Sequence, residues 1–566
     1  MEMDTGLQVH GVSTSPEAAM SARRRPEVLN DLNRLIARVA RRAERNGPEI
    51  LARTFVEVDK ISCDLQGVDH QVLYGRRGTG KTHALNHFST QLKSQGELAI
   101  YIDLRRIGSN GGLYSDSASD LSLRASQLLI DVIEAVHNSL FDAAADNDAH
   151  SGVLNYLDDL GEAATKVRVE GPLQQLVEVE NESNDGHQRM LEAGIRSTTG
   201  VSTSVNRGNS RQQKSRKKRS VSRMGNELPR LLFGELGRCM DNVANAVAPG
   251  RIWMLLDEWS SLPTDLQPIL ADMLKRTFFT CPRLTVKIAS VERRSSFVTR
   301  ESQSRYIGIE LGADTTAALN LDDHLIGFSD GSSKASEFFS ELIYRHLSAL
   351  YEDLGRIVQF PIATPGELIE LLFDRSAFGE FVMAAEGVPR DAINILGLSA
   401  SIAGSAQISS ADVRRAARQY YLQDKEKGIT GNRRAEYVWQ KLQRDVIVSN
   451  RKRTFLLKRV KEQTYDAMLD LYDARLIHLL RPGLTSHSRP GASYDGYSID
   501  YGAYVNILKE AELAAMWRAS RHQPTHAERS LPPSNPVSHF DDELVFTPPR
   551  QRSTIAPSQH VTPPQQ

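Results

Sequence analysis

Eight residues in the first part of the chain have the types and the spacing of a phosphate-binding loop. Residues 75–82 read GRRGTGKT and fit the pattern G-x-x-x-x-G-K-[ST] at every position. The glycines let the backbone curl so that its N–H groups face phosphate oxygens, and a following helix adds the positive end of its dipole. A nucleotide is therefore expected to contact Gly75, Arg76, Arg77, Gly78, Thr79, Gly80, Lys81, Thr82 and the adjoining His83.

Two side chains of this loop have separate chemical tasks. The ammonium group of Lys81 is expected to reach the β- and γ-phosphates and to support the reaction there. The hydroxyl of Thr82 is expected to bind Mg²⁺. An apolar segment, HQVLYG, precedes the loop, and a helical pattern follows it. This strand–loop–helix context is the one that a phosphate-binding loop requires.

A pair of carboxylates far along the chain completes the predicted chemistry. Asp257 and Glu258 follow the apolar run IWMLL, so they are expected at the carboxyl end of a buried strand, where ligands of open α/β sheets bind. Asp257 would hold Mg²⁺ directly or through water, and Glu258 would polarise a water for attack on the γ-phosphate. The alternative is a strand that merely ends in two exposed acids. A water-activating glutamate argues against a nucleotide kinase, which must exclude water.

Four buried strands are expected to position these residues. The apolar segments at 70–75, 98–104, 251–258 and 284–290 alternate with helical segments. Such alternation indicates an α/β fold with a mostly parallel sheet.

The segment between the two motifs is longer than a compact core requires. Lys81 and Asp257 are 176 residues apart, about twice what a small set of βαβ units needs. We therefore predict an insertion over 107–226, helical at first and then a disordered basic loop over 196–226. The loop's run RQQKSRKKR fits a nucleic-acid contact, a localisation signal or a spacer, and these alternatives stay open.

Both ends of the chain have a disorder-like composition. Residues 1–20 and the Pro-, Ser- and Gln-rich residues 517–566 are predicted to be disordered, with DDELVF in the tail as a possible docking motif. Over 21–47, apolar residues recur at helical spacing with arginines on the other face. We interpret this segment as a helix that packs on the α/β core, and a basic arm contacting nucleic acid is the alternative. Its apolar residues are Leu29, Leu32, Leu35, Ile36 and Val39.

The order of motifs resembles the core of AAA+ ATPases, which implies ATP and Mg²⁺ as ligands. The strand LTVKIAS then resembles the sensor 1 strand, with Ser290 at the polar position that contacts the γ-phosphate and Glu292 as a competitor. The family pattern more often has Asn or Thr there. In AAA+ proteins an arginine before the next strand reaches the ATP of a neighbouring subunit, and Arg300 or Arg305 stands in that place. This resemblance implies self-association or a partner chain.

Residues 385–421 resemble the helical lid of the origin-recognition and initiator clade of AAA+ proteins. The resemblance places the sensor 2 arginine at Arg390, where it would contact the γ-phosphate. It also implies a winged helix over 426–516, made of a helix and a β-hairpin, that engages DNA. Basic residues near this hairpin could meet DNA phosphates, or the winged helix could contact protein instead. They are Lys452, Arg453, Lys458 and Arg459.

The predicted organisation has an AAA+ core over 21–106 and 227–330, a lid over 331–425 and the winged helix after it. The net charge of -1 favours no partner class, and the three cysteines lack metal-ligand spacing. No apolar run reaches the roughly 18 residues of a membrane helix, so we expect a cytoplasmic protein without membrane contact. The function expected is ATP hydrolysis coupled to DNA engagement. The alternative is a STAND-like signalling switch that binds protein partners.

Overall fold

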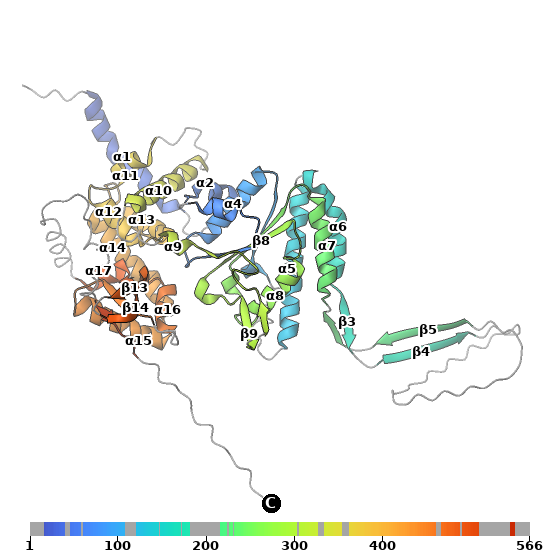
Figure 1. Cartoon of the computed structure of the whole chain (residues 1–566). Helices are drawn as coiled ribbons and strands as arrows, with labels where there is room; N and C mark the ends of the chain where they lie inside the picture. The colour runs from blue at the N-terminus through green and yellow to red at the C-terminus, as the bar shows by residue number, and fades with distance from the viewer. Residues whose placement is uncertain are drawn as a thin grey trace, which may run out of the picture.

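The computed structural model describes residues 16–39, 46–57, 60–107, 120–146, 148–170, 173–180, 216–223, 226–229, 231–302, 305–325, 333–353, 362–459, 466–486, 489–508 and 544–549. Within these ranges an α/β part adjoins a helical part, and a mixed α and β unit near the C-terminus lies below the helical part (Figure 1). No helix among the described residues is long and apolar enough to cross a membrane.

Five parallel strands form the central sheet in the spatial order β11-β1-β8-β7-β2. Because carboxyl ends of parallel strands meet at one edge of a sheet, the last residues of these strands gather there. Tyr74 lies beside Ser290, and Asp103 lies beside Asp257. The predicted parallel sheet is confirmed, and its strands are β1 (Gln71–Tyr74), β2 (Leu98–Asp103), β7 (Ile252–Asp257), β8 (Leu284–Ser290) and β11 (Leu319–Asn320).

Helices cover both faces of this sheet because its strands are apolar on both sides. Leu73 and Leu255 face the layer of α2 (Pro48–Thr54), α3 (Ile61–Leu65) and α4 (Lys81–Ser94). Val72 and Met254 point the other way, into a core shared with α5, α7 and α8. Those helices span α5 (Leu121–Ala145), α7 (Phe233–Ala246) and α8 (Gln267–Thr277), and α6 (Leu154–Ala164) packs on α5 and α7.

The prediction that 107–226 is an insertion is wrong for α5, which belongs to the core. Its apolar face is fully buried in the same cluster as the sheet residues Ile100 and Met254. The amphipathic pattern indicated that one face is buried, but it could not indicate against which element. The buried face consists of Leu128, Leu129, Val132, Ile133, Val136 and Leu140.

Two antiparallel ribbons extend from α6 and α7 instead. One pairs β3 (Val167–Glu170) with β6 (Asn226–Pro229), and the other pairs β4 (Leu173–Glu180) with β5 (Arg216–Arg223). Figure 1 shows the second ribbon projecting away from the rest of the molecule. Disorder over 196–226 was therefore a wrong prediction for β5, whose pairing partner is far away in sequence. Residues 196–215 lie outside the described residues.

The helical part stands at the position of the predicted lid and is called the lid below. Its helices share one apolar core. Thr364 accepts a hydrogen bond from the backbone of Glu367 and caps α11, and Ser409 with Asp412 forms a capping box on α14. The helices are α10 (Ser333–Asp353), α11 (Pro365–Leu372), α12 (Ala377–Ala385), α13 (Pro389–Ala403) and α14 (Ser410–Tyr420).

Helix α1 (Pro16–Arg38) packs on this helical part and not on the α/β core. Leu32, Leu35 and Ile36 are buried in this apolar core. The side-chain amide of Asn33 donates a hydrogen bond to the backbone carbonyl of Gly404. The predicted apolar face is confirmed, and the predicted packing partner is wrong. The helix also begins at Pro16, inside the segment expected to be disordered, since proline suits the first helical turn.

The C-terminal unit combines helices with a four-stranded sheet of order β13-β14-β12-β15. A helix followed by a β-hairpin was predicted and is present as α16, β13 and β14. The elements are α15 (Arg433–Leu442), β12 (Thr454–Lys458), α16 (Asp466–Asp473), β13 (Ile477–Ser486), β14 (Arg489–Ile499) and α17 (Tyr501–Ile507).

A short strand of the tail, β15 (Val545–Phe546), completes this sheet by parallel pairing with β12. Phe546 is buried and lies edge-on to Phe455, with ring centroids 5.7 Å apart. Disorder over 517–566 was therefore a wrong prediction for this segment, because one buried aromatic side chain and a strand edge hold it in place. Residues 517–543 and 550–566 lie outside the described residues.

Candidate nucleotide site

The phosphate-binding loop lies between β1 and α4, at the carboxyl edge of the sheet. Gly78 has φ of 92° and Gly80 has φ of 103°, a left-handed backbone that favours glycine. The buried ammonium of Lys81 donates to the carbonyls of Gly75 (2.8 Å) and Arg76 (3.0 Å). Burial lowers the pKa of Lys81, and the Asp257 carboxylate opposes this shift. The loop thus encloses the Lys81 ammonium, and its contact with phosphates stays a prediction.

Asp257 and Thr82 meet across the loop. The Thr82 hydroxyl donates to Asp257 Oδ2 at 2.6 Å, and the backbone N–H of Glu258 donates to Oδ1 at 2.8 Å. Asp257 is fully buried. A hydroxyl and a carboxylate brought together in this way are hard oxygen donors of the kind that Mg²⁺ binds. The residues present therefore fit the predicted metal.

Tyr101 is a member of this cluster that the sequence reasoning missed. Its hydroxyl donates to Asp257 Oδ2 at 2.7 Å, and its strand β2 lies next to β7. Burial and the Asp257 carboxylate raise the pKa of the Tyr101 phenol, so it remains a donor. The available signal was its position two residues before the end of the LAIYID strand.

Glu258 is held in an unusual backbone conformation beside the carboxylate. Its φ is 60°, in the left-handed region, which costs a non-glycine residue of order 1–3 kcal/mol. Burial and the charge of Asp257 raise the pKa of Glu258, while Arg105 opposes the shift. Arg105 lies 3.8 Å from Glu258 and 2.8 Å from Asp103. A carboxylate with a raised proton affinity next to a phosphate loop suits proton acceptance.

Ser290, and not Glu292, lies at the edge of the sheet. Ser290 is fully buried at the end of β8, next to Tyr74, and its hydroxyl bonds to that of Ser295. Glu292 is exposed in the turn after the strand. The geometry therefore favours Ser290 of the two predicted candidates.

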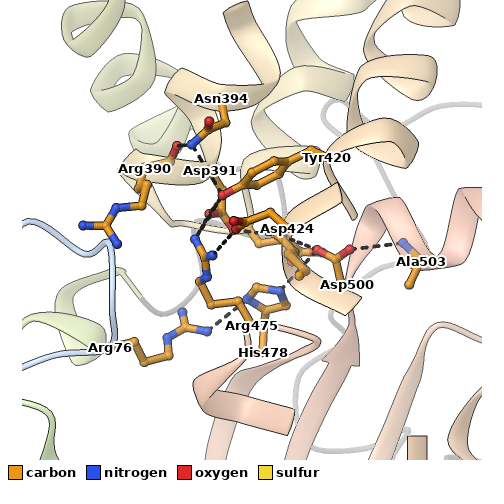
Figure 2. A network of polar contacts seen from close by, with 12 residues as sticks. Arg76, Arg390, Asp391, Asn394, Tyr420, Asp424, Arg475, His478, Asp500 and Ala503 are labelled. Carbon is orange, nitrogen blue, oxygen red and sulfur yellow. Dashed lines mark hydrogen bonds and ion pairs between the residues drawn. The ribbon is translucent and has the colours of Figure 1, made fainter. Parts of the chain in front are cut away.

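Arg390 reaches the loop from the lid. It is the second residue of α13, and its backbone N–H donates to the carbonyl of Gly78 at 3.2 Å. A Cβ on Gly78 would lie 2.9 Å from Arg390 Cβ, so glycine is also needed for this close approach. Figure 2 shows the Arg390 guanidinium turned toward the loop. A cavity of about 600 Å³ between core, lid and C-terminal unit has Arg77 and Arg390 in its wall.

Three predicted residues lie elsewhere. The His83 ring faces α2, with Nε2 2.6 Å from the Leu51 carbonyl oxygen, and burial lowers its pKa to about 4. Arg300 lies on β9 (Val298–Ser302) and is 75% exposed, with Glu310 at 3.9 Å. Arg305 begins β10 (Arg305–Gly308), which pairs with β9. The structure thus places both arginine-finger candidates on one hairpin.

Arg76 has partners that its place in the motif did not reveal. Its Nε and backbone N–H donate to Asp322, at 3.1 and 2.8 Å. Its guanidinium lies 3.0 Å from Nδ1 of His478 and 4.8 Å from the ring centroid of Tyr472. The side chain is buried and points toward His478 (Figure 2).

A buried polar network continues from His478 into the lid. His478 lies 3.7 Å from Asp500, which bonds to Lys425, and Lys425 lies 2.8 Å from Asp391. Arg475 bonds to the same Asp391 (Figure 2). Burial lowers the pKa of His478 to about 3, so the ring is neutral. The network joins the phosphate loop, the C-terminal unit and the residue after Arg390.

Comparison with models of known protein families identifies a family for this chain. The family model described as ORC-CDC6-like matches residues 39–369, which is more than half of the chain. A solved structure, of the Aeropyrum pernix ORC1 protein in complex with DNA, is similar over 83% of this chain and 94% of its own, at 14% identity and a TM-score of 0.25. A search of curated proteins finds no match.

Proposed function

The chain belongs to the ORC-CDC6-like family, and we propose that it binds and hydrolyses ATP and couples the nucleotide state to DNA engagement. The observation that carries this proposal is the contact of Thr82 with Asp257, which joins the phosphate loop to the end of β7. A hydroxyl, a buried carboxylate and the Lys81 ammonium at one sheet edge are what a magnesium–nucleotide complex requires.

The chemistry of the site is divided among a few side chains. Lys81 would bind the β- and γ-phosphates, and Glu258 would take a proton from the attacking water. Mg²⁺ bound by Thr82 and Asp257 would neutralise phosphate charge. Ser290 and Arg390 would contact the γ-phosphate from the core and from the lid. The raised pKa of Glu258 supports its role as a base.

Coupling to the C-terminal unit is supported by Arg76. This loop residue contacts His478 and Tyr472 of that unit. A movement of the loop on nucleotide binding would therefore shift these two contacts. We propose that the unit engages DNA as a winged helix. Lys458 is exposed and Arg459 is half-exposed, bonded to Asp495. Arg453 is not available for DNA, because its guanidinium bonds to Glu386 in the lid and is 14% exposed.

A second subunit would complete the site. The exposed position of Arg300 on the β9–β10 hairpin suits an arginine that reaches the ATP of a neighbouring chain, and Arg305 is the alternative. A guanidinium matches phosphate oxygens through its planar fork.

The test is DNA binding by Glu258→Gln across a salt series, with ATP, with ADP and without nucleotide. We expect ATP to be bound and kept intact, and DNA affinity to fall steeply with salt only in the ATP state. Lys81→Ala is the matched control, which should lose ATP and the ATP-dependent part of DNA binding. Intact ATP binding without DNA binding in any state would favour a protein-binding switch.

A further inference from the structure

Arg77 occupies a different environment from the other cations around the loop. It lies between Arg76 and Gly78, is exposed, and forms part of the wall of the 600 Å³ cavity together with Arg294 and Arg390. Gly78, the next residue, is held by the backbone of Arg390. The loop and the lid therefore hold two guanidinium groups at the same cavity.

Arg77 and Arg390 have no acidic partner within salt-bridge distance among the residues that the structure describes. Their neighbours in the cavity wall do have partners. Arg294 bonds to Asp473 at 2.5 Å, and Arg475 bonds to Asp424 at 2.8 Å and also to Asp391. Among the described residues, Arg77 and Arg390 are thus the arginines of this wall that form no salt bridge. The wall also contains Asp470, which accepts a hydrogen bond from Asn432.

The charges around Arg77 indicate the charge of the ligand that would bind beside it. Partial burial lowers the pKa of Arg77, and the positive charges of Arg294 and Arg390 lower it further. The carboxylates of Glu258 and Asp473 raise it. Arg77 is thus within electrostatic reach of the predicted base and of Arg390. An anion between these groups would relieve the crowding of like charges.

We propose that Arg77 contacts the terminal phosphate of ATP bound in the same chain and stabilises the charge that develops during hydrolysis. This inference rests on the proposed function. The water oxygen forms a bond to the γ-phosphorus, and the bond from that phosphorus to the bridging oxygen breaks. The electron pair leaves with ADP, and a water proton passes to Glu258. Arg77 acts on the phosphoryl oxygens, where a guanidinium fork suits the geometry.

The first experiment compares hydrolysis and transition-state binding in Arg77→Ala. We expect single-turnover hydrolysis to fall by about 10²–10³-fold, the effect of removing one transition-state donor. ADP affinity should stay within about threefold, and ADP with aluminium fluoride should lose its extra affinity. Arg77→Lys should recover part of the rate, because the charge remains without the fork.

The matched control is Arg276→Ala on the surface of α8. Arg276 is 58% exposed, bonds to Asp272 of its own helix and lies 5.9 Å from the ring centroid of Phe233 on α7. We expect this variant to hydrolyse ATP at the parental rate. A parental rate in Arg77→Ala as well would overturn the inference, and so would equal losses of ADP and aluminium fluoride binding.

A mixing experiment tests whether Arg77 acts in its own chain. Arg77→Ala and Glu258→Gln chains are combined in varying ratios, and hydrolysis is measured. An Arg77 acting within its chain leaves the mixture inactive, because no chain then has both residues. Recovery of activity would show an action in trans and overturn the inference. A parental chain that neither binds nor hydrolyses ATP would remove the proposed function itself, a result separate from these.

Discussion

The two faces of the phosphate-binding loop use the same residue type in opposite ways. On the face toward the C-terminal unit, Arg76 is buried and bonded to Asp322 and His478. On the face toward the lid cavity, Arg77 is exposed and has no acidic partner among the described residues. The difference shows that local pairing, and not residue type, separates a cation that supports the fold from one that can meet an anion.

The largest effect that tests this comparison is on stability. Arg76→Leu leaves the buried Asp322 carboxylate without its guanidinium and should cost about 3–5 kcal/mol of unfolding free energy. Arg77→Leu should change it by less than about 0.5 kcal/mol, as for other surface substitutions. Urea unfolding at neutral pH measures both. Equal losses in the two variants would show that the faces are not different.

Acid should destabilise the Arg76 face through His478. Since burial lowers the pKa of His478 to about 3, from an ordinary value of 6.5, the unfolded chain binds this proton more readily than the folded chain. Stability is therefore lost as the pH falls below 6.5, by up to about 1.4 kcal/mol per pH unit for one histidine.

His478→Gln should remove the contribution of this histidine to the loss of unfolding free energy between pH 6 and 4. Urea midpoints at several pH values measure the slope. His83 and His346, whose pKa values burial also lowers to about 4, supply a remaining slope. A variant whose slope equals that of the parental chain would mean that His478 titrates normally.

A smaller effect is expected from Tyr101→Phe, which removes one donor from Asp257 but leaves the ring in place. A hydrogen bond to a charged group contributes about 1.5–3 kcal/mol, so hydrolysis should fall by roughly 10–100-fold. Tyr306→Phe, at an exposed tyrosine of β10, is the control. Turnover assays with saturating ATP measure both, and an unchanged rate in Tyr101→Phe would exclude its positioning role.

The smallest effect applies the same rule to DNA binding. Lys458 is exposed, so Lys458→Ala should reduce the slope of log affinity against log salt by about one. Arg459→Ala should change it less, since Arg459 is bonded to Asp495. Equal changes in the two variants would contradict the rule that pairing decides which cation meets phosphate.

Short-range patterns predicted the parts of the site that a single segment encodes. The phosphate loop and the carboxylate pair follow from the types and spacing of neighbouring residues. The sequence did not predict which distant segments pack together. It did not indicate that α1 packs on the lid or that α5 packs on the central sheet. Tyr101 and the contact of Arg76 with His478 join residues far apart in sequence, so no local pattern contains them.

The contact between Arg390 and Gly78 is made from main chain to main chain. Its donor is a peptide N–H that every amino acid except proline carries at position 390. A substitution of Arg390 by any residue except proline can therefore remove the guanidinium and keep the main-chain hydrogen bond to Gly78. We therefore expect the main-chain contact and the proposed phosphate contact to be separable at this one residue. Arg390→Ala should remove the guanidinium alone, whereas Arg390→Pro should remove the hydrogen bond to Gly78.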